Sequence, residues 1–321
     1  MGTRIGVIIA AYNGAAFLPA TLEGVLAQVH VDLECVVVDD GSRDETARVA
    51  AAFAARDRRV RVLTQANAGA PAAYNRGLRE TNGAELVALL DQDDVWEPGA
   101  LAALASRLSA EPAAVAAHGL ARFIDAGGRP TAPPPFAADM LERWTVVAGR
   151  ARRVPDAPLT TLSTLLIANC IATPGAALLR RDALTRAGGL DPERYIADWD
   201  LWLRLAAIGP FAFVGEPVIA YRVHDSGMSA REGPMRREAD LVWRRAMARA
   251  AAEPAHAATV RAVWRFTEAR LARRRLAWAR EALAHGRVLD AARQLRHAAV
   301  SAVAKLAPAR GLRGLTDGPV A

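Results

Sequence analysis

The sequence predicts an α/β fold: a mostly parallel sheet flanked by helices, followed by a C-terminal helical appendage. Over the first hundred residues, strand-like and helix-like segments alternate, a pattern that places a parallel sheet between two helical layers. Polar clusters directly follow three of these strands, and the chain becomes helical and basic from about Glu232 onward. We therefore expect an α/β domain over residues 1–230, a basic helical appendage over 231–310 and a disordered tail over 311–321.

The individual elements follow from hydrophobic periodicity and from turn residues. Strands are expected over residues 4–11, 33–38, 59–64 and 85–90, and helices over 15–28, 44–56 and 71–81. Later in the chain, a loop or hairpin is expected over residues 125–135, strand structure over 165–179, a helix over 198–207 and a strand over 211–221. In parallel sheets, ligands bind at the carboxyl ends of the strands, where the three polar clusters would meet.

Composition favours a soluble, cytoplasmic protein. The chain has 321 residues, 52% of them apolar, which is enough to bury a sizeable core. Its two cysteines, Cys35 and Cys170, lie in apolar runs, so buried free thiols are expected rather than a disulfide framework or a zinc site. We expect no signal peptide, and the longest apolar candidate, residues 159–179, is interrupted by Asn169 and Pro174 and falls short of a membrane span.

Positive charge is concentrated in the C-terminal segment. Residues 231–310 carry 18 Lys and Arg against 7 Asp and Glu, a net charge of +11, whereas the remainder of the chain has a net charge of −4. Such a surface suits nucleic acid or an anionic membrane. We expect helices that pack on the α/β domain and lean toward an anionic membrane surface, without specific nucleic-acid binding; a solvated arginine face on a structural helix pair is the alternative. The residues behind this expectation are Trp243, Trp264 and Trp278 and the basic face of Arg270, Arg273 and Arg274.

The sharpest chemical feature is the segment Leu90-Asp91-Gln92-Asp93-Asp94, which directly follows an apolar strand. Three carboxylates this close repel one another unless a cation or hydrogen-bond donors offset their charge. Carboxylates are hard oxygen ligands that suit Mg²⁺ or Mn²⁺ shared with phosphate oxygens. The alternative is a turn that caps the helix beginning near Pro98.

Three other polar groups are weaker candidates. In Val38-Asp39-Asp40-Gly41-Ser42, a short acidic side chain could accept a hydrogen bond from a base or a ribose hydroxyl, or the segment is an ordinary turn with an N-cap. Asp198 and Asp200 open a helix but point in different directions, so one can cap the helix while the other faces a cleft. His224 leaves a strand and is either a metal ligand or a structural histidine.

Together these segments resemble a family 2 glycosyltransferase with the GT-A fold, of the nucleotide-diphospho-sugar transferase superfamily. The resemblance covers about residues 4–230, and its order and spacing are specific. The matching segments are Val7 to Asn13, Val38-Asp39-Asp40-Gly41-Ser42, Asn67-Ala68-Gly69, Asn75-Arg76-Gly77, Leu90 to Asp94, Gly188-Gly189-Leu190-Asp191, Asp198 to Arg204, and Tyr221-Arg222-Val223-His224.

The resemblance implies a role for each site residue. Tyr12 would pack on the nucleotide base, Asp39 or Asp40 would contact the base or ribose, with Asp40 favoured for the base, and Asn67 and Arg76 would help to bind the donor. Asp91 and Asp93 would form the D-x-D pair, with Asp93 the direct ligand of Mn²⁺ or Mg²⁺, His224 completing the metal shell and Arg222 touching the diphosphate. Asp198 would be the general base. Two departures from the family pattern are Tyr74, where arginine often precedes Asn75, and Ala197, where glutamate often precedes Asp198.

The implied activity is inverting, metal-dependent transfer of a hexosyl or deoxyhexosyl group. The donor would be a UDP- or dTDP-sugar, and the acceptor a saccharide or lipid-linked saccharide in cell-envelope polysaccharide or glycolipid assembly. The enzyme would be cytoplasmic or peripheral at the inner face of the cell membrane. Two alternatives remain: a sugar-nucleotide-forming nucleotidyltransferase, although Tyr12-Asn13-Gly14-Ala15 lacks the cation that a triphosphate loop needs, and a non-catalytic binding protein of the same fold, against which the retained acids count.

Overall fold

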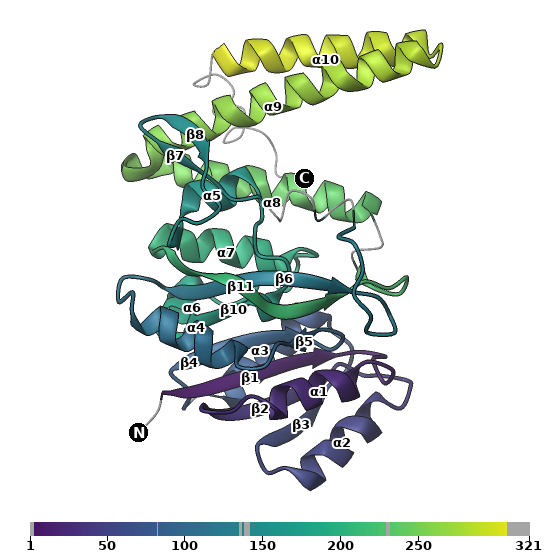
Figure 1. The fold of residues 1–321 in the computed structure, drawn as a ribbon, viewed down its shortest axis with the longest axis vertical. Coiled ribbons are helices and arrows are strands. Elements are labelled where there is room, and N and C mark those ends of the chain that lie inside the picture. Colours follow the sequence, from purple (N-terminus) through teal and green to yellow (C-terminus); the bar gives the residue numbers. More distant parts are fainter. Residues whose placement is uncertain (1–2, 82, 135–136, 138–141, 229–231, 307–321) are drawn as a thin grey trace.

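The computed structural model describes residues 3–81, 83–134, 137, 142–228 and 232–306. A central sheet occupies one part of the elongated molecule, and long helices cover one end of it (Figure 1). The first half follows the predicted order of strands and helices. Its elements are β1 (Arg4–Ala11), α1 (Leu18–Leu26), β2 (Asp32–Asp39), α2 (Thr46–Arg56), β3 (Val60–Thr64), α3 (Ala70–Glu80) and β4 (Leu86–Asp91).

The register of the sheet brings the predicted polar clusters to one edge. Strands β3, β2, β1 and β4 are neighbours in that order and run parallel. Asp39 at the end of β2 pairs with Ala11 of β1 and with Thr64 of β3, and Ala10 pairs with Asp91 of β4. The loops that follow these strands therefore leave the sheet side by side, as the sequence predicts.

The second half completes a mixed sheet. β10 (Ala177–Arg180) lies antiparallel between β4 and β6 (Ala116–Ile124). β11 (Phe211–Arg222) runs parallel to β6 and antiparallel to β5 (Val95–Trp96) and β9 (Leu159–Thr160). The helices of this half are α4 (Ala100–Ser109), α5 (Leu162–Ile167), α6 (Arg181–Ala187) and α7 (Ala197–Ile208). The predicted α/β fold with a mostly parallel sheet is confirmed.

The prediction of strand structure over residues 165–179 is wrong for most of that range. The chain forms α5, then a loop and a short 3₁₀ helix over Pro174–Ala176, and enters a strand only at Ala177. Thr161 and Thr164 form a capping box that starts α5. A short apolar run buried on all sides has no periodicity that separates helix from strand. Strand β6 and the hairpin of β7 (Trp144–Val147) and β8 (Arg150–Arg153) were not predicted.

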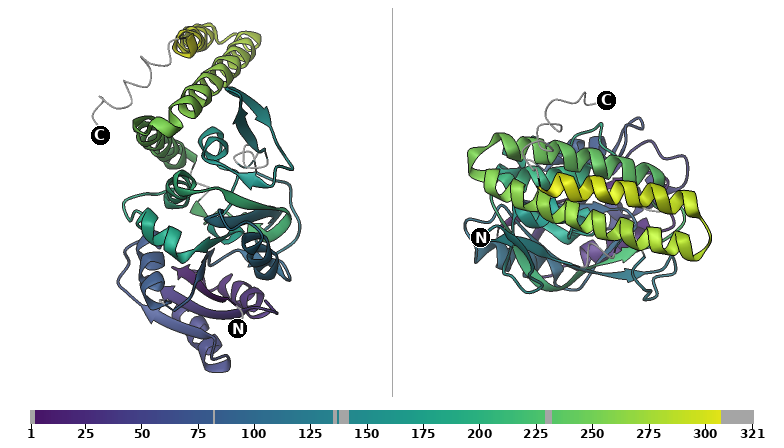
Figure 2. Two further views of the ribbon diagram at one scale, coloured as in Figure 1. Left: turned by 90° about the vertical axis from the view of Figure 1, so that its left-hand side faces the viewer. Right: turned by 90° about the horizontal axis from the view of Figure 1, so that it is seen from above.

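Three helices follow the sheet domain: α8 (Glu232–Ala252), α9 (Ala257–Ala284) and α10 (Val288–Leu306). They stack outward from one end of the sheet domain, with α8 nearest to it and α10 farthest away (Figure 1, Figure 2). The helical segment is interrupted near Pro254, which starts a short 3₁₀ helix, and at Gly286, whose φ is 69°. No helix among the described residues combines the length and the apolar content needed to cross a membrane. The proposed domain boundaries stay predictions, and Pro308 and residues 311–321 lie outside the described part of the chain.

Helix α8 is joined to the sheet domain by buried contacts. The indole N–H of Trp243 donates to the Leu166 carbonyl over 2.9 Å, and the rings of Trp243 and Trp264 stack with centroids 5.9 Å apart. Arg249 of α8 donates to Asp200 of α7 over 2.9 Å. Trp264 is therefore buried, and Trp243 is half-buried against the core.

Both cysteines are buried and free, as predicted. Burial raises the pKa of the Cys35 thiol to about 12 and that of the Cys170 thiol to about 11. Both thiols therefore stay protonated at neutral pH and act as small apolar groups.

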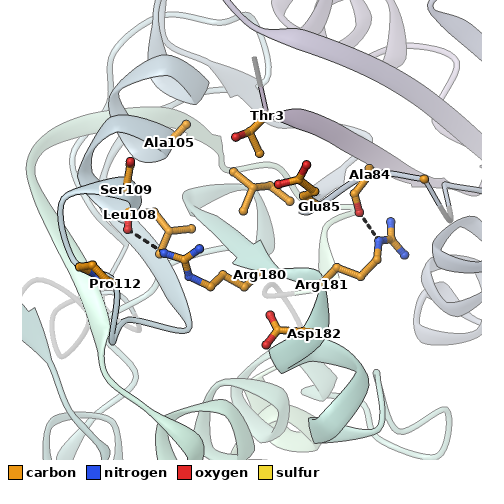
Figure 3. Close-up of a pocket in the computed structure, with 12 residues that line it drawn as sticks. Thr3, Ala84, Glu85, Ala105, Leu108, Ser109, Pro112, Arg180, Arg181 and Asp182 are labelled. Atoms are coloured by element: carbon orange, nitrogen blue, oxygen red, sulfur yellow. Dashed lines mark hydrogen bonds between the residues drawn. The ribbon is translucent and has the colours of Figure 1, made fainter. Parts of the chain in front are cut away.

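A cavity of about 790 Å³ lies at the opposite edge of the sheet from the polar clusters. Figure 3 shows Arg180 and Arg181 lining it, with Arg180 directed toward Leu108 and Arg181 toward Ala84. Arg180 donates to the Leu108 carbonyl over 3.0 Å, and Arg181 donates to the Leu78 carbonyl over 3.1 Å. These carbonyls lie near the carboxyl ends of α4 and α3, where free backbone acceptors and the helix dipole favour cations. The two arginines thus have a structural role: they cap the C-terminal ends of α4 and α3.

The fully buried His118 on β6 should make stability depend on pH. Its Nε2 lies 2.7 Å from the Thr160 hydroxyl, and burial lowers its pKa to about 3. The folded chain keeps His118 neutral while the unfolded chain binds a proton near pH 6.5, so the free energy of unfolding should decrease as pH falls from 6.5 toward 3. The full loss would be roughly 5 kcal/mol.

Denaturant titrations between pH 7 and pH 4 test this dependence. We expect His118→Gln to flatten the dependence relative to the unchanged protein, and the exposed His285→Gln to leave it unchanged. Equal slopes in His118→Gln and the unchanged protein would show that His118 is not the group responsible.

Candidate active site

The acidic loop after β4 forms a connected hydrogen-bond network. The Tyr74 hydroxyl donates to Asp91 Oδ1 over 2.6 Å. The Thr173 hydroxyl lies 2.6 Å from Asp94 Oδ2 and 3.2 Å from Asp91 Oδ2, so one proton serves both carboxylates. The backbone N–H of Arg222 donates to Asp94 Oδ1 over 2.9 Å. Asp91 and Asp94 are thus fixed by neutral donors on α3, β11 and the segment before β10.

Burial and mutual repulsion perturb these carboxylates. Burial first, and then the charges of Asp93 and Asp198, raise the pKa of Asp91 to about 7 against the opposing hydrogen bonds from Tyr74 and Thr173. The pKa of Asp94 is also raised, by burial first and then by the charges of Asp93 and Asp91. An acidic cluster of this kind is stabilised by a bound cation.

Asp93 faces His224, which lies just beyond β11. His224 Nε2 is 2.9 Å from Asp93 Oδ2, although the two residues are 131 positions apart in the chain. The other ring nitrogen of His224 lies 2.8 Å from the Ser226 hydroxyl, and the Phe17 ring packs 4.5 Å from the imidazole, centroid to centroid. A carboxylate and an imidazole are therefore held together with a fixed ring orientation.

Arg222 supports the acidic loop from beneath. Its side chain is buried, its Nε donates to the Asp93 carbonyl over 2.8 Å, and its Nη1 donates to the carbonyls of Asp125 and Ala126 over 3.2 Å each. The predicted contact of Arg222 with a diphosphate stays a prediction. Its cationic group does lie directly under the loop that carries Asp93.

Tyr12 is positioned by Gln92 of the acidic loop. The Gln92 amide accepts a hydrogen bond from the Tyr12 N–H over 2.8 Å and donates to the Tyr12 carbonyl over 3.0 Å. Meanwhile the Tyr12 side chain is 42% exposed. Its backbone is fixed and its ring is partly exposed, and the packing of this ring on a base stays a prediction.

The two acids after β2 have different environments. Asp40 Oδ1 accepts from the Gln65 amide (2.7 Å) and the Ala68 N–H (2.9 Å), and its Oδ2 accepts from the Gly69 N–H (2.8 Å). Asn67 donates to the Asp40 carbonyl over 3.0 Å. The neighbouring Asp39 accepts only from the Ser42 N–H, over 3.3 Å, among the contacts of the described residues. Asp40 thus shapes the loop over residues 65–69, and Asp39 keeps more acceptor capacity.

The segment Asn75-Arg76-Gly77 of α3 is largely structural. Asn75 exchanges two hydrogen bonds with the backbone of Leu190, at 2.7 and 3.0 Å. A Cβ on Gly77 would lie 2.3 Å from Ile8 Cγ2, so only glycine lets α3 pack this closely on β1. Arg76 donates to the Thr64 carbonyl at the end of β3 over 2.9 Å. Its predicted contact with a donor is untested.

Asp198 and Asp200 in the first turn of α7 serve different purposes. Asp200 is buried and pairs with Arg204 and Arg249 at 2.8 and 2.9 Å. Asp198 is partly exposed, makes no such ion pair among the described residues, and raises the pKa of Asp91 through its charge. Desolvation by the surrounding protein raises the pKa of Asp198 itself to about 6. Asp198 therefore lies next to the acidic loop with a carboxylate suited to accept a proton near neutral pH.

Several residues of this site were not predicted from the sequence. Gln92 stands inside the acidic segment, where only its position offered a signal. Tyr74 was noted only because arginine often stands at its position in the family. In the structure its hydroxyl donates a hydrogen bond that holds Asp91 in place. Thr173 and Phe17 had no signal, because their roles depend on the packing of segments far apart in the chain.

The fold and the site define a class of enzyme: a GT-A type transferase with an acidic loop at the carboxyl edge of a mostly parallel sheet. The sequence profile described as "Glycosyl transferase family 2" matches residues 6–187, more than half of the chain. The chain therefore belongs to glycosyltransferase family 2.

Known proteins of the same kind resemble the chain over most of its length. An uncharacterised glycosyltransferase of Nostoc is 29% identical over 255 residues, which cover 74% of this chain and 70% of the relative. A structure of residues 1–349 of S. aureus TarS with UDP has a TM-score of 0.54 at 16% identity, and the match covers 82% of this chain and 65% of that one. The corresponding structure with UDP-GlcNAc has a TM-score of 0.58 at 14% identity, and the match covers 92% of this chain and 91% of that one. The mannosyltransferase PcManGT of Pyrobaculum calidifontis, in complex with GDP-Man and Mn²⁺, has a TM-score of 0.56 at 21% identity, covering 97% of this chain and 81% of that one.

Proposed function

We propose that the chain transfers a sugar from a nucleotide-diphosphate donor to an acceptor hydroxyl, with inversion at the anomeric carbon and with the help of a divalent metal ion. The observation that carries the proposal is the contact of Asp93 with His224, at the same sheet edge as Tyr12, Asp39 and Asp198. The donors bound by TarS and PcManGT support a nucleotide sugar in general. UDP-, dTDP- and GDP-sugars are all candidates.

The residues present fit a divalent ion. Among the described residues no group of three or more His, Cys, Asp and Glu side chains forms a complete metal site. The Asp93–His224 pair offers one carboxylate and one imidazole, and ions shared with a diphosphate take their other ligands from phosphate oxygens and water. Asp91 has protein donors on both oxygens, so Asp93 is the better ligand of the D-x-D pair. When bound, the ion would offset the negative charge that develops on the leaving diphosphate.

The chain's own residues would orient the donor and move one proton. The base would pack on Tyr12, and Asp39 would accept a hydrogen bond from the base or ribose; this revises our preference for Asp40, whose carboxylate is engaged in its own loop. Asp198 would accept the proton of the acceptor hydroxyl as that oxygen bonds to the anomeric carbon. The bond from this carbon to the diphosphate oxygen breaks in the same in-line step, and the configuration inverts.

We place this reaction in cell-envelope polysaccharide or glycolipid assembly, with hexosyl or deoxyhexosyl transfer to a saccharide or lipid-linked saccharide at the inner face of the cell membrane. The basic helices beyond the sheet domain support such a peripheral location. Family membership favours a glycosyltransferase over the nucleotidyltransferase alternative. Measured turnover would exclude the non-catalytic alternative.

A thermal-shift screen of UDP-, dTDP- and GDP-sugars, each with Mn²⁺ and with a chelator, tests the donor class. A ligand at a hundred times its Kd stabilises the folded state by about 2.7 kcal/mol. We expect at least one nucleotide sugar to raise the Tm in Mn²⁺ and to lose most of that effect in chelator. Equal shifts in both conditions would contradict metal-dependent binding, and no shift with any donor would contradict the donor class.

A further inference from the structure

The last two helices form a hairpin whose described interior consists of small side chains. α9 and α10 pack antiparallel, and α10 is the outermost element of the molecule (Figure 1). Beyond the main core, the buried apolar cluster between them consists of Ala279, Ala282 and Ala291. This alanine contact brings the helices close together and directs the larger apolar side chains elsewhere.

Those larger side chains face solvent. Seven of the eleven large hydrophobic side chains that are exposed within the described residues lie in this hairpin. Such clustering is unusual for a free surface, because scattered exposed apolar residues are normal but contiguous groups mark contact sites. The seven, with their exposed fractions, are Leu276 (42%), Trp278 (43%), Leu283 (52%), Val288 (64%), Leu289 (87%), Leu295 (46%) and Val300 (61%).

Helix geometry aligns four of them into one stripe. With 100° per residue, Leu276 and Leu283 lie on one side of the α9 face that contacts α10 through Ala279 and Ala282. Val288 and Leu295 are rotated about the α10 axis by a similar angle, and in the same sense, from the face that contacts α9. Because the helices are antiparallel, both pairs lie on the same side of the hairpin. We call Leu276, Leu283, Val288 and Leu295 the apolar stripe.

Arginines surround the apolar stripe. Residues 270–300 contain eight arginines against two acids, Glu281 and Asp290. Arg273, Arg280 and Arg296 are exposed, and their helical positions lie beside the stripe. Arg287 lies 4.0 Å from Asp290, so one of the two acids is already paired. The surface is therefore apolar in its middle and strongly cationic at its margins.

We infer that the apolar stripe inserts at the surface of an anionic lipid bilayer while the flanking arginines contact the headgroups. An anionic bilayer offers both an apolar layer and negative charge. A second copy of the chain would bring two arginine-rich faces together, and nucleic acid has no need of an apolar stripe. The inference rests on the peripheral location proposed above and names the surface responsible. Of the three tryptophans named from the sequence, Trp264 is buried and Trp243 is half-buried against the core, whereas Trp278 is exposed on the hairpin.

Flotation of the full chain with vesicles tests this inference. The vesicles are neutral phosphatidylcholine or a mixture with phosphatidylglycerol, each at low and high salt. We expect binding to the anionic vesicles only, weakened by salt, and reduced roughly tenfold by Leu295→Glu or Arg280→Glu. Val29→Glu is the matched control, because Val29 is 57% exposed on the sheet domain, and it should bind like the unchanged protein.

A fluorescent label reports insertion directly. A polarity-sensitive dye on Leu295→Cys should shift to shorter wavelength with anionic vesicles, whereas the same dye on Val29→Cys should not. The inference is wrong if Leu295→Glu and Val29→Glu bind equally, or if sedimentation shows that Leu295→Glu instead dissociates a dimer. Metal-dependent nucleotide-sugar binding is measured in the same variants. If the variants fail the vesicle test but still bind the nucleotide sugar in a metal-dependent way, only the membrane inference is wrong. The proposed transferase activity then still stands.

Discussion

Replacement of Asp198 by asparagine should lower kcat by about 10²- to 10⁴-fold, the range that a general base contributes, while leaving donor affinity nearly unchanged. Asparagine keeps the shape of the side chain but cannot accept the proton of the acceptor. The donor does not need this proton transfer, so its Kd should stay within a few-fold. Turnover and donor binding are measured on the same preparation, with the donor that the thermal-shift screen identifies.

The pH dependence of turnover gives a second readout of Asp198. Its pKa is raised to about 6 by burial, and only the carboxylate can accept a proton. Turnover of bound substrate should therefore fall as pH decreases through about 6, by about tenfold for each unit below it. Asp290→Asn, on the exposed α10, is the matched control and should retain the full rate and the same profile. Loss of donor affinity in Asp198→Asn with turnover intact would show that Asp198 binds the donor instead.

Replacement of Asp93 by asparagine should abolish metal-dependent transfer, with a loss of roughly 10²-fold or more. The carboxylate of Asp93 is partly exposed and faces His224 at 2.9 Å, so it is the ligand that the site can least replace. The variant should also bind the nucleotide sugar equally in Mn²⁺ and in chelator. The rate of nucleoside diphosphate release and the donor Kd are measured in both conditions.

Two comparisons separate this metal role from a general loss of structure. His224→Ala should show the same loss of Mn²⁺ dependence with a smaller loss of rate, because the carboxylate remains. Asp182→Asn, at the cavity on the opposite edge of the sheet, should behave like the unchanged protein. Full turnover of Asp93→Asn, or of the unchanged protein in excess chelator, would contradict the metal role.

The sequence predicted the parallel half of the fold well because its strands and helices carry opposite periodicities and are separated by short turns. The strand over residues 4–11 was predicted to the residue. The region around α5 was not, because Leu162 to Ile167 is buried from all sides and a helix there depends on the capping of Thr161. β6 was missed because it begins with Ala116 and Ala117, and alanine favours helix over strand.

The candidate site divides in the same way. Asp91, Asp93 and His224 were named from their residue types and positions after strands, and Asp198 from its position at the start of a helix and the family resemblance. The fold brings them together at one edge. Sequence could not reveal that Asp40 is engaged by its own loop, or that Thr173 bridges two carboxylates. Both depend on contacts between segments separated by tens of residues. The different roles of Asp198 and Asp200 likewise depend on a distant residue, because Arg249 of α8 forms an ion pair with Asp200.

A crystal structure with Mn²⁺ and the stabilising nucleotide sugar tests the central claim most directly, because the anomalous signal of manganese locates the ion independently of the refined atoms. We predict one strong peak beside Asp93 and His224, with the diphosphate against it, the base on Tyr12 and the sugar toward Asp198. A nucleotide bound elsewhere, such as the cavity at Arg180 and Arg181, or a donor bound at Tyr12 with no manganese peak beside Asp93, would contradict it.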